Sequence, residues 1–160
     1  MNNYISAEIE FTVEFYDVDS MMIVWHGNYL KYFEMARSAL LKKIGFSYIE
    51  MRETGWMFPV TAVSAKYIRP LGFCDRVRAL AFLVEYENCI KIKYELYNTA
   101  SGLLCTRGES TQMAVEAASG ESHIVCPAIF TGKVEAMLCA EYSPERAKAG
   151  ENSRLGEKNE

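Results

Sequence analysis

The chain has 160 residues, half of them apolar and 24% charged, which is the composition of a single soluble globular domain with a sizeable core. Its formal net charge of −4 argues against a general nucleic-acid-binding protein, since such proteins carry a basic excess. No apolar run reaches the ~18–20 residues of a membrane span, and the start of the chain lacks the pattern of a secretory signal peptide.

The cysteines and histidines narrow the function classes further. The 5 cysteines form no Cys-x-x-Cys pair and their number is odd, so we expect free thiols and a cytoplasmic protein. The 2 histidines, His26 and His123, have no ligand residues near them at metal-binding spacing. We therefore expect no metal ion.

The first predicted elements are a strand and a long helix. Over residues 8–15 apolar and polar side chains alternate, which predicts a half-buried strand. Over residues 27–44 the apolar residues recur at steps of three and four instead, which predicts a largely enclosed helix. Gly45 is the expected residue after its C-terminus, and a short helix over residues 48–54 is expected to follow.

The rest of the chain predicts consecutive antiparallel strands, over residues 57–68, 76–86, 89–98 and 103–115. Pro59 should make the first of them irregular at its beginning. A final short helix is expected over residues 127–138. Strand, long helix and meander form an α+β pattern, with the sheet wrapped over the helix. We expect one domain over residues 1–140 and a charged, disordered tail over residues 141–160.

The segment FYDVDSMMIVWHGNY, residues 15–29, is the most informative part of the sequence. Asp17 and Asp19 follow the first strand, and His26 stands at the expected start of the long helix. A helix start exposes N–H groups that polarise a carbonyl oxygen while a carboxylate acts on the carbon. The pattern therefore favours attack on a carbonyl group, although loop aspartates most often only cap turns.

This segment resembles the active-site segment of hotdog-fold acyl-CoA thioesterases of the 4-hydroxybenzoyl-CoA thioesterase family, which reads D-x-D-x-x-G-[IV]-V-x-[HY]-x-N-Y. A histidine at position 26 is typical of the bacterial short-chain acyl-CoA thioesterases in that family. Residues 51–71 resemble the family's second strand, which ends in Y-x-R-P, here Tyr67 to Pro70. The resemblance covers roughly residues 7–116. It implies a hotdog fold, in which a five-stranded antiparallel sheet wraps around one long helix.

The resemblance also implies roles for single residues. Asp19 matches the catalytic carboxylate, which acts as nucleophile or as general base towards water, whereas Asp17 matches a position that orders the loop. His26 would offer its backbone N–H to the carbonyl oxygen, and its imidazole is a candidate for orienting water or carrying a proton. Gly27 belongs to the same substrate-binding helix start. Tyr29 is expected both to contact the substrate and to seat the helix by packing.

Two further residues bear on the site. Met22 stands where the family has Gly, so a positive φ there would strain the loop. Met21 and Met22 are also expected to line the acyl pocket, because methionine side chains adapt to varied apolar shapes. Glu34, three residues before Arg37, should form an ion pair with it, and it is the reserve candidate for the catalytic carboxylate.

The function implied by the resemblance is hydrolysis of an acyl-CoA to a free acid and coenzyme A, by a homodimer or homotetramer without a cofactor. Several basic side chains are candidates for the phosphates of coenzyme A, or else simply face solvent: Lys66, Arg69, Lys91, Lys93 and Arg107. The alternative is a non-catalytic protein of the same fold that binds acyl-CoA or an acyl-carrier protein. A hotdog dehydratase or hydratase is disfavoured because the histidine motif of those enzymes is missing.

Overall fold

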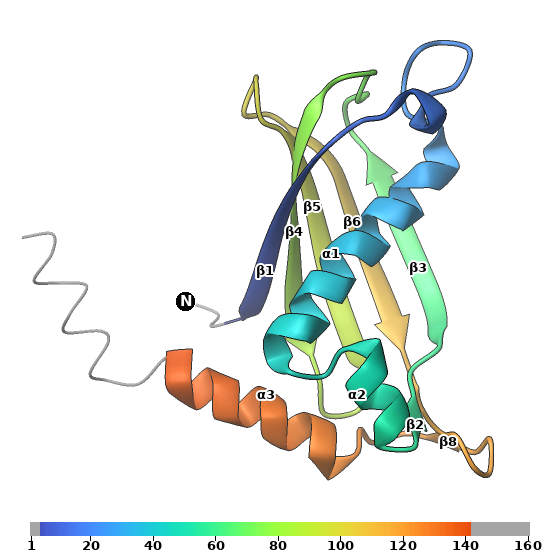
Figure 1. Ribbon diagram of the computed structural model, residues 1–160, viewed down its shortest axis with the longest axis vertical. Coiled ribbons are helices and arrows are strands. Elements are labelled where there is room, and N and C mark those ends of the chain that lie inside the picture. The colour runs from blue at the N-terminus through green and yellow to red at the C-terminus, as the bar shows by residue number, and fades with distance from the viewer. Residues whose placement is uncertain (1–3, 142–160) are drawn as a thin grey trace, which may run out of the picture.

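The computed structural model describes residues 4–141, and five antiparallel strands with one long helix dominate it (Figure 1). The sheet has the order β1-β4-β5-β6-β3, with β1 and β3 at its edges. The strands are β1 (Ile5–Thr12), β4 (Arg76–Glu85), β5 (Ile90–Asn98), β6 (Leu104–Gln112) and β3 (Val60–Tyr67). Helix α1 (Tyr29–Ile44) crosses one face of this sheet. The predicted hotdog architecture is confirmed.

The core lies between α1 and the sheet, and the alternation within the strands creates it. On β5 the apolar side chains of every second residue face α1 and are buried: Ile90, Ile92, Tyr94 and Leu96. Gly108 of β6 lets the helix come close, since a Cβ atom there would lie 2.3 Å from the ring of Phe33. The Phe33 ring instead stacks on Tyr94, with 4.6 Å between ring centroids.

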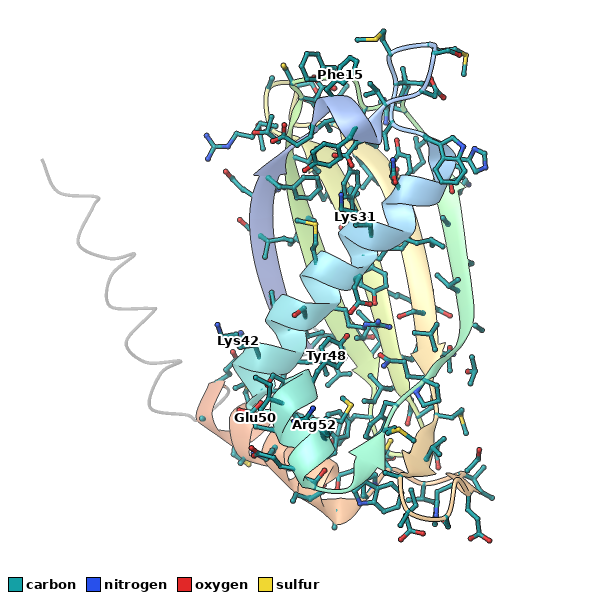
Figure 2. All side chains as sticks on the ribbon, turned by 45° about the vertical axis from the view of Figure 1, so that its right-hand side comes forward. Phe15, Lys31, Lys42, Tyr48, Glu50 and Arg52 are labelled. Atoms are coloured by element: carbon teal, nitrogen blue, oxygen red, sulfur yellow. The ribbon has the colours of Figure 1, made fainter. Side chains whose placement is uncertain are left out.

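The smaller elements close one end of the sheet. They are α2 (Tyr48–Glu53), the short strands β2 (Trp56–Met57), β7 (Ala114–Glu116) and β8 (Ser122–His123), and helix α3 (Ala128–Glu141). Figure 2 places Tyr48 and Glu50 at this end and Phe15 at the opposite one, where the chain passes from β1 to α1. Within residues 4–141 no helix combines the length and the apolar character needed to cross a membrane.

The structure corrects several predicted boundaries. Strand β1 begins three residues earlier than predicted and ends at Thr12, and Phe15 is 70% exposed because it opens a 3-10 helix, η1 (Phe15–Asp17). The predicted strand over 57–68 is interrupted at Pro59, which agrees with the irregular beginning expected there. The predicted strand over 103–115 divides at Met113, after which β7 joins a separate three-stranded sheet. Most of the tail predicted over 141–160 lies outside the described residues.

Candidate active site

Asp17 orders the loop between β1 and α1. Its carboxylate is buried, and it accepts hydrogen bonds from the Glu14 backbone N–H at 3.1 Å and from the Lys31 ammonium at 3.2 Å. Its carbonyl oxygen accepts the Trp25 N–H at 2.9 Å and the Asn28 side-chain amide at 2.8 Å. All of these contacts lie within the loop or join the loop to the start of α1. Asp17 therefore holds the loop in its conformation.

Asp19 sits in a tight turn, which engages one oxygen of its carboxylate. Its Oδ1 accepts the backbone N–H of Met21 at 2.8 Å, its carbonyl accepts the N–H of Met22 at 2.9 Å, and its own N–H donates to the Ile23 carbonyl at 2.9 Å. The described part of the chain offers no hydrogen-bond partner to Oδ2. The carboxylate is therefore fixed in direction while one of its oxygens can meet a substrate.

Met22 has the strained backbone that its position in the pattern suggested. Its φ is 59°, in the left-handed region that favours glycine. A residue with a side chain pays about 1–2 kcal/mol for this conformation. The turn around Asp19 therefore keeps a glycine-like shape although a methionine occupies it. The side chain of Met22 is 49% exposed.

The helix start is built from a short 3-10 helix, η2 (His26–Asn28), that runs into α1. The predicted helix start at residue 27 therefore falls within η2. The N–H groups of His26 and Gly27 stand at its beginning and have no acceptor inside the helix. The hydroxyl of Tyr67 on β3 donates to the His26 carbonyl at 2.8 Å. A Cβ atom at Gly27 would lie 2.2 Å from the Trp25 ring, so the indole covers this residue closely.

These elements surround a cavity of about 310 Å³. It is lined by Asp19, Met21, Ile23, Val24, His26, Tyr29, Tyr67, Ile68, Arg69 and Pro70. Three residues expected at the site from the sequence, Asp19, His26 and Tyr29, thus meet at one cavity. Met22 and Gly27 do not line it, and Met21 does. Tyr67 on β3 was not assigned a role from the sequence, although the Y-x-R-P pattern marks its position.

Tyr29 and Tyr32, near the site, stay protonated at neutral pH. Burial raises the pKa of Tyr29 above its ordinary value. Burial also raises the pKa of Tyr32, and the charge of Asp17 adds to this effect. A tyrosine that does not ionise cannot serve as a general base. Tyr29 therefore lines the cavity as an uncharged aromatic side chain.

Glu34 is fully engaged elsewhere. It forms the predicted ion pair with Arg37, and its Oε1 accepts the hydroxyl of Tyr48 at 2.5 Å. The Arg37 Nε donates to the same hydroxyl at 3.0 Å. Glu34 lines a different cavity, of about 200 Å³, between α1 and β3. With both carboxylate oxygens occupied, Glu34 is a weaker candidate than Asp19 for attack on a carbonyl.

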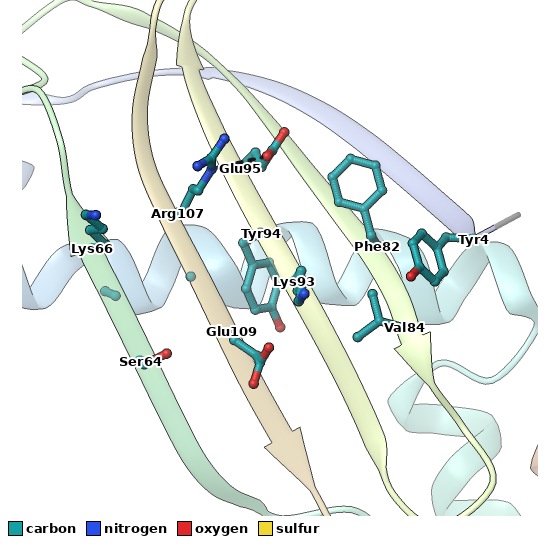
Figure 3. Close-up of a pocket in the computed structure, with 12 residues that line it drawn as sticks. Tyr4, Ser64, Lys66, Phe82, Val84, Lys93, Tyr94, Glu95, Arg107 and Glu109 are labelled. Carbon is teal, nitrogen blue, oxygen red and sulfur yellow. Dashed lines mark ion pairs between the residues drawn. The ribbon is translucent and has the colours of Figure 1, made fainter. Parts of the chain in front are cut away.

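A hollow larger than these two cavities lies on the outer face of the sheet, away from α1 (Figure 3). It measures about 670 Å³, and Lys66, Lys93 and Arg107 gather around it. Arg107 pairs there with Glu95 at 3.4 Å. Lys91 lies on the same outer face but does not line the hollow. It pairs with Glu109 at 3.8 Å. Arg107 and Lys91 thus pair with acids on a solvent-facing surface.

Arg69 is the one basic candidate that lines the cavity of Asp19. Its Nη1 donates to the Leu104 carbonyl at 2.7 Å, and no carboxylate within residues 4–141 pairs with it. A guanidinium held this way keeps donors available to an anion.

The described residues give little support to metal-dependent catalysis or to catalysis by a cysteine thiol. Residues 4–141 contain no group of three His, Cys, Asp or Glu side chains placed to hold a metal ion. All 5 cysteines have free thiols. Burial raises the pKa of the Cys126 thiol to about 12 and also raises that of Cys105, so neither is a ready nucleophile at neutral pH.

Comparison with known proteins places the chain in a family. Residues 13–143 match the family described as "Thioesterase-like superfamily". The chain belongs to this superfamily. A relative in Bacillus subtilis (strain 168), named "Putative acyl-CoA thioesterase YneP", is 32% identical over 108 residues, which cover 67% of this chain and 78% of the relative. Membership confirms the resemblance seen in the sequence and, at the level of the family, the predicted class of thioester hydrolase.

Solved structures of other proteins share the fold of this chain. The DHNA-CoA thioesterase of Staphylococcus aureus has a TM-score of 0.69 at 23% identity, with 94% of this chain and 91% of that one covered. A variant of 4-hydroxybenzoyl-CoA thioesterase in complex with 4-hydroxybenzoyl-CoA has a TM-score of 0.71 at 18% identity, with 81% and 99% covered. At these identities the likeness establishes the hotdog fold.

Proposed function

We propose that the protein is an acyl-CoA thioesterase, which hydrolyses an acyl-CoA to a free acid and coenzyme A. One observation carries this proposal: Asp19, whose Oδ2 has no hydrogen-bond partner among residues 4–141, lines the same cavity as His26 at the start of the helix. Such a site can polarise a carbonyl oxygen and attack its carbon at the same time. Relatives named as thioesterases support the choice of a thioester.

The reaction has two routes from this geometry. In the first, Asp19 Oδ2 attacks the carbonyl carbon, the thiolate of coenzyme A leaves, and water then hydrolyses the mixed anhydride. In the second, Asp19 takes a proton from water while the water oxygen attacks the carbon. In both routes the negative charge that develops on the carbonyl oxygen faces the N–H groups at the helix start. Both yield one carboxylic acid and one thiol per water consumed.

The cavity wall suggests how the substrate lies. Met21 and Tyr29 offer apolar surface beside Asp19, suited to the first carbons of the acyl group. Arg69 is the cation we assign to the coenzyme A side, where it would meet an anionic or amide oxygen of the carrier. His26 would contribute its N–H and assist water with its imidazole. Met22 and Gly27 would act through the backbone shape of the turn and of the helix start.

The exposed edge of the sheet bears on assembly. Strand β3 is almost entirely exposed, and Val60, Val63 and Tyr67 on it are 44–50% exposed. A long apolar edge strand invites pairing with another strand. We propose that two copies pair here as a homodimer, which could double into a homotetramer, in the cytoplasm. Light scattering coupled to size exclusion measures the assembly, and a strictly monomeric protein would refute this part.

A second candidate function is a non-catalytic protein that binds acyl-CoA or an acyl-carrier protein. The feature that favours this candidate is the strained turn at Met22, where the family has glycine. The two functions differ in turnover. Purified protein mixed with acyl-CoAs of short, long, branched and aromatic chains should release free thiol, also in the presence of a metal chelator. Tight binding of acyl-CoA without thiol release across the whole panel would instead establish the binding protein.

A further inference from the structure

Four charged side chains surround the hollow on the outer face of the sheet, and their signs alternate across the strands β5 and β6 (Figure 3). The register of these two strands places Lys93 opposite Glu109 and Glu95 opposite Arg107. The Arg107 Nε lies 3.4 Å from Oε1 of Glu95. Each facing pair therefore combines one base with one acid.

These four charges become self-complementary when two copies of the face meet. A twofold axis along the seam between β5 and β6, parallel to the strands, exchanges the positions of the two strands. Lys93 of one copy then faces Glu109 of the other, and Glu95 faces Arg107. Packed sheets cross at about 30°, so the pairs beside the axis remain opposed.

Strand β4 adds an apolar row to the same face. Leu80, Phe82 and Val84 alternate with buried residues along it and are themselves only partly buried. The solvated face of an antiparallel sheet is normally polar, so an apolar row there is suited to contact with another surface. The same axis brings this row over β3 of the other copy, at Ser64 and the aliphatic stem of Lys66.

The face is large enough for a stable contact. Its five strands have 8 to 10 residues, so at ~4.8 Å between strands and ~3.4 Å per residue the face spans roughly 19 Å by 30 Å. Two such faces bury roughly 1,100 Å² when they meet, and a specific interface needs about 1,000 Å². Pairing of two β3 edges widens this face without covering it, so both contacts fit in one assembly.

We infer that the outer face of the sheet binds the same face of a second copy, about a twofold axis along the seam between β5 and β6. The apolar row on β4 supplies area that is removed from water, and the central charges fix the relative position of the two copies. This inference does not rest on the thioesterase activity. It adds a contact to the β3 pairing proposed above, so the wild-type protein should form a tetramer.

Arg107→Glu tests this contact, because it sets a negative charge against Glu95 of the other copy on both sides of the axis. The mass from light scattering coupled to size exclusion should halve at equal protein concentration. Adding Glu95→Arg to this variant restores opposite charges within and between copies, so the wild-type mass should return. Arg52→Glu is the matched control, because it makes the same change of charge at an exposed position on α2. It should keep the wild-type mass.

Phe82→Glu provides a second test that does not depend on the folding of Arg107→Glu. Phe82 lies opposite Lys93 on β5, so a glutamate there has a partner of opposite charge within the chain, while the apolar row loses its central member. The mass should halve again, with the circular dichroism spectrum of the wild type.

The masses also separate the two proposed contacts. A wild-type dimer that both variants convert into monomers supports the outer-face contact and refutes the β3 pairing. A monomeric wild-type protein overturns the inference. An unchanged mass in either folded variant, Arg107→Glu or Phe82→Glu, overturns it as well and leaves the hollow open to a small ligand.

Discussion

The backbone N–H of Met21 donates to Oδ1 of Asp19 at 2.8 Å, which holds the carboxylate while leaving Oδ2 without a partner among residues 4–141. Asp17, two residues earlier, is the opposite case, because it is buried and binds Lys31 and the Glu14 N–H. The two aspartates of one short motif therefore have different surroundings. The first holds the loop, and the second lines the cavity.

Replacing Asp19 by Asn should remove the reaction while leaving the fold intact. The amide keeps the shape and the acceptor for Met21 but loses the charge needed for attack or for proton removal. We expect kcat to fall by at least ~10², which corresponds to about 2.7 kcal/mol of activation free energy. Thiol release under saturating acyl-CoA measures it.

Asp17→Asn is the matched control for that variant. It weakens the contact with Lys31 and leaves Oδ2 of Asp19 in place, so kcat should fall less than in Asp19→Asn. Stability should suffer more, because Asp17 is buried in the loop. If Asp17→Asn instead lost more activity than Asp19→Asn, the assignment of the two carboxylates would be reversed.

Substituting His26 by Ala separates its two proposed roles. The backbone N–H stays in place, so a role for the N–H alone predicts nearly full activity. A role for the imidazole in proton transfer predicts a loss of ~10²–10⁴ and a neutral limb in the wild-type pH–rate profile that the variant lacks. We expect an intermediate loss, about 10-fold, because a carboxylate can attack a polarised thioester without imidazole. A folded but inactive variant would rank His26 above Asp19.

Met22→Gly should stabilise the protein. Glycine relieves the left-handed strain of about 1–2 kcal/mol but costs about 0.5–1 kcal/mol in chain entropy. The free energy of unfolding should therefore rise by about 0.5–1 kcal/mol, measured by urea denaturation. Met22→Ala is the control, since alanine keeps the strain and should bring no gain. Equal stabilities of the glycine variant and wild type would show that the strain at φ 59° does not exceed the entropy cost of glycine.

A side chain at Gly108 should destabilise the core. The Cβ of Gly108→Ala would lie 2.3 Å from the buried ring of Phe33, which is stacked on Tyr94 and cannot withdraw freely. We expect a loss of about 1–3 kcal/mol in the free energy of unfolding. Gly132→Ala in α3 meets nothing within 4 Å and should instead gain up to about 1 kcal/mol. Equal effects of the two substitutions would contradict the close approach of α1 to β6.

Local periodicity was sufficient to predict the main elements of the fold. The alternation on β5 and the three-and-four spacing on α1 identify the strand and helix that form the core, and Gly45 adopts the φ of 76° expected after a helix. The end of β1 was missed because Phe15 continues the alternation while the chain turns into η1. The periodicity of apolar residues predicts which side chains are buried in a regular strand or helix. It does not predict where the chain leaves the strand for a 3-10 turn.

Only part of the candidate site could be predicted from the sequence. The motif located Asp19 and the helix start because both lie within one continuous segment. Tyr67 comes from a strand 41 residues further on, and its bond to His26 depends on how β3 passes α1. Likewise, the spacing could not separate Arg69 from Lys93, because it does not say which face of the sheet each side chain joins.

Thiol release from acyl-CoA by the purified protein, with a metal chelator present, tests the central claim most directly. The account predicts turnover of at least one acyl-CoA in a panel of short, long, branched and aromatic chains, and its loss by at least ~10² in Asp19→Asn. Tight binding of acyl-CoA without any thiol release would contradict it, as would full activity in the Asp19→Asn variant.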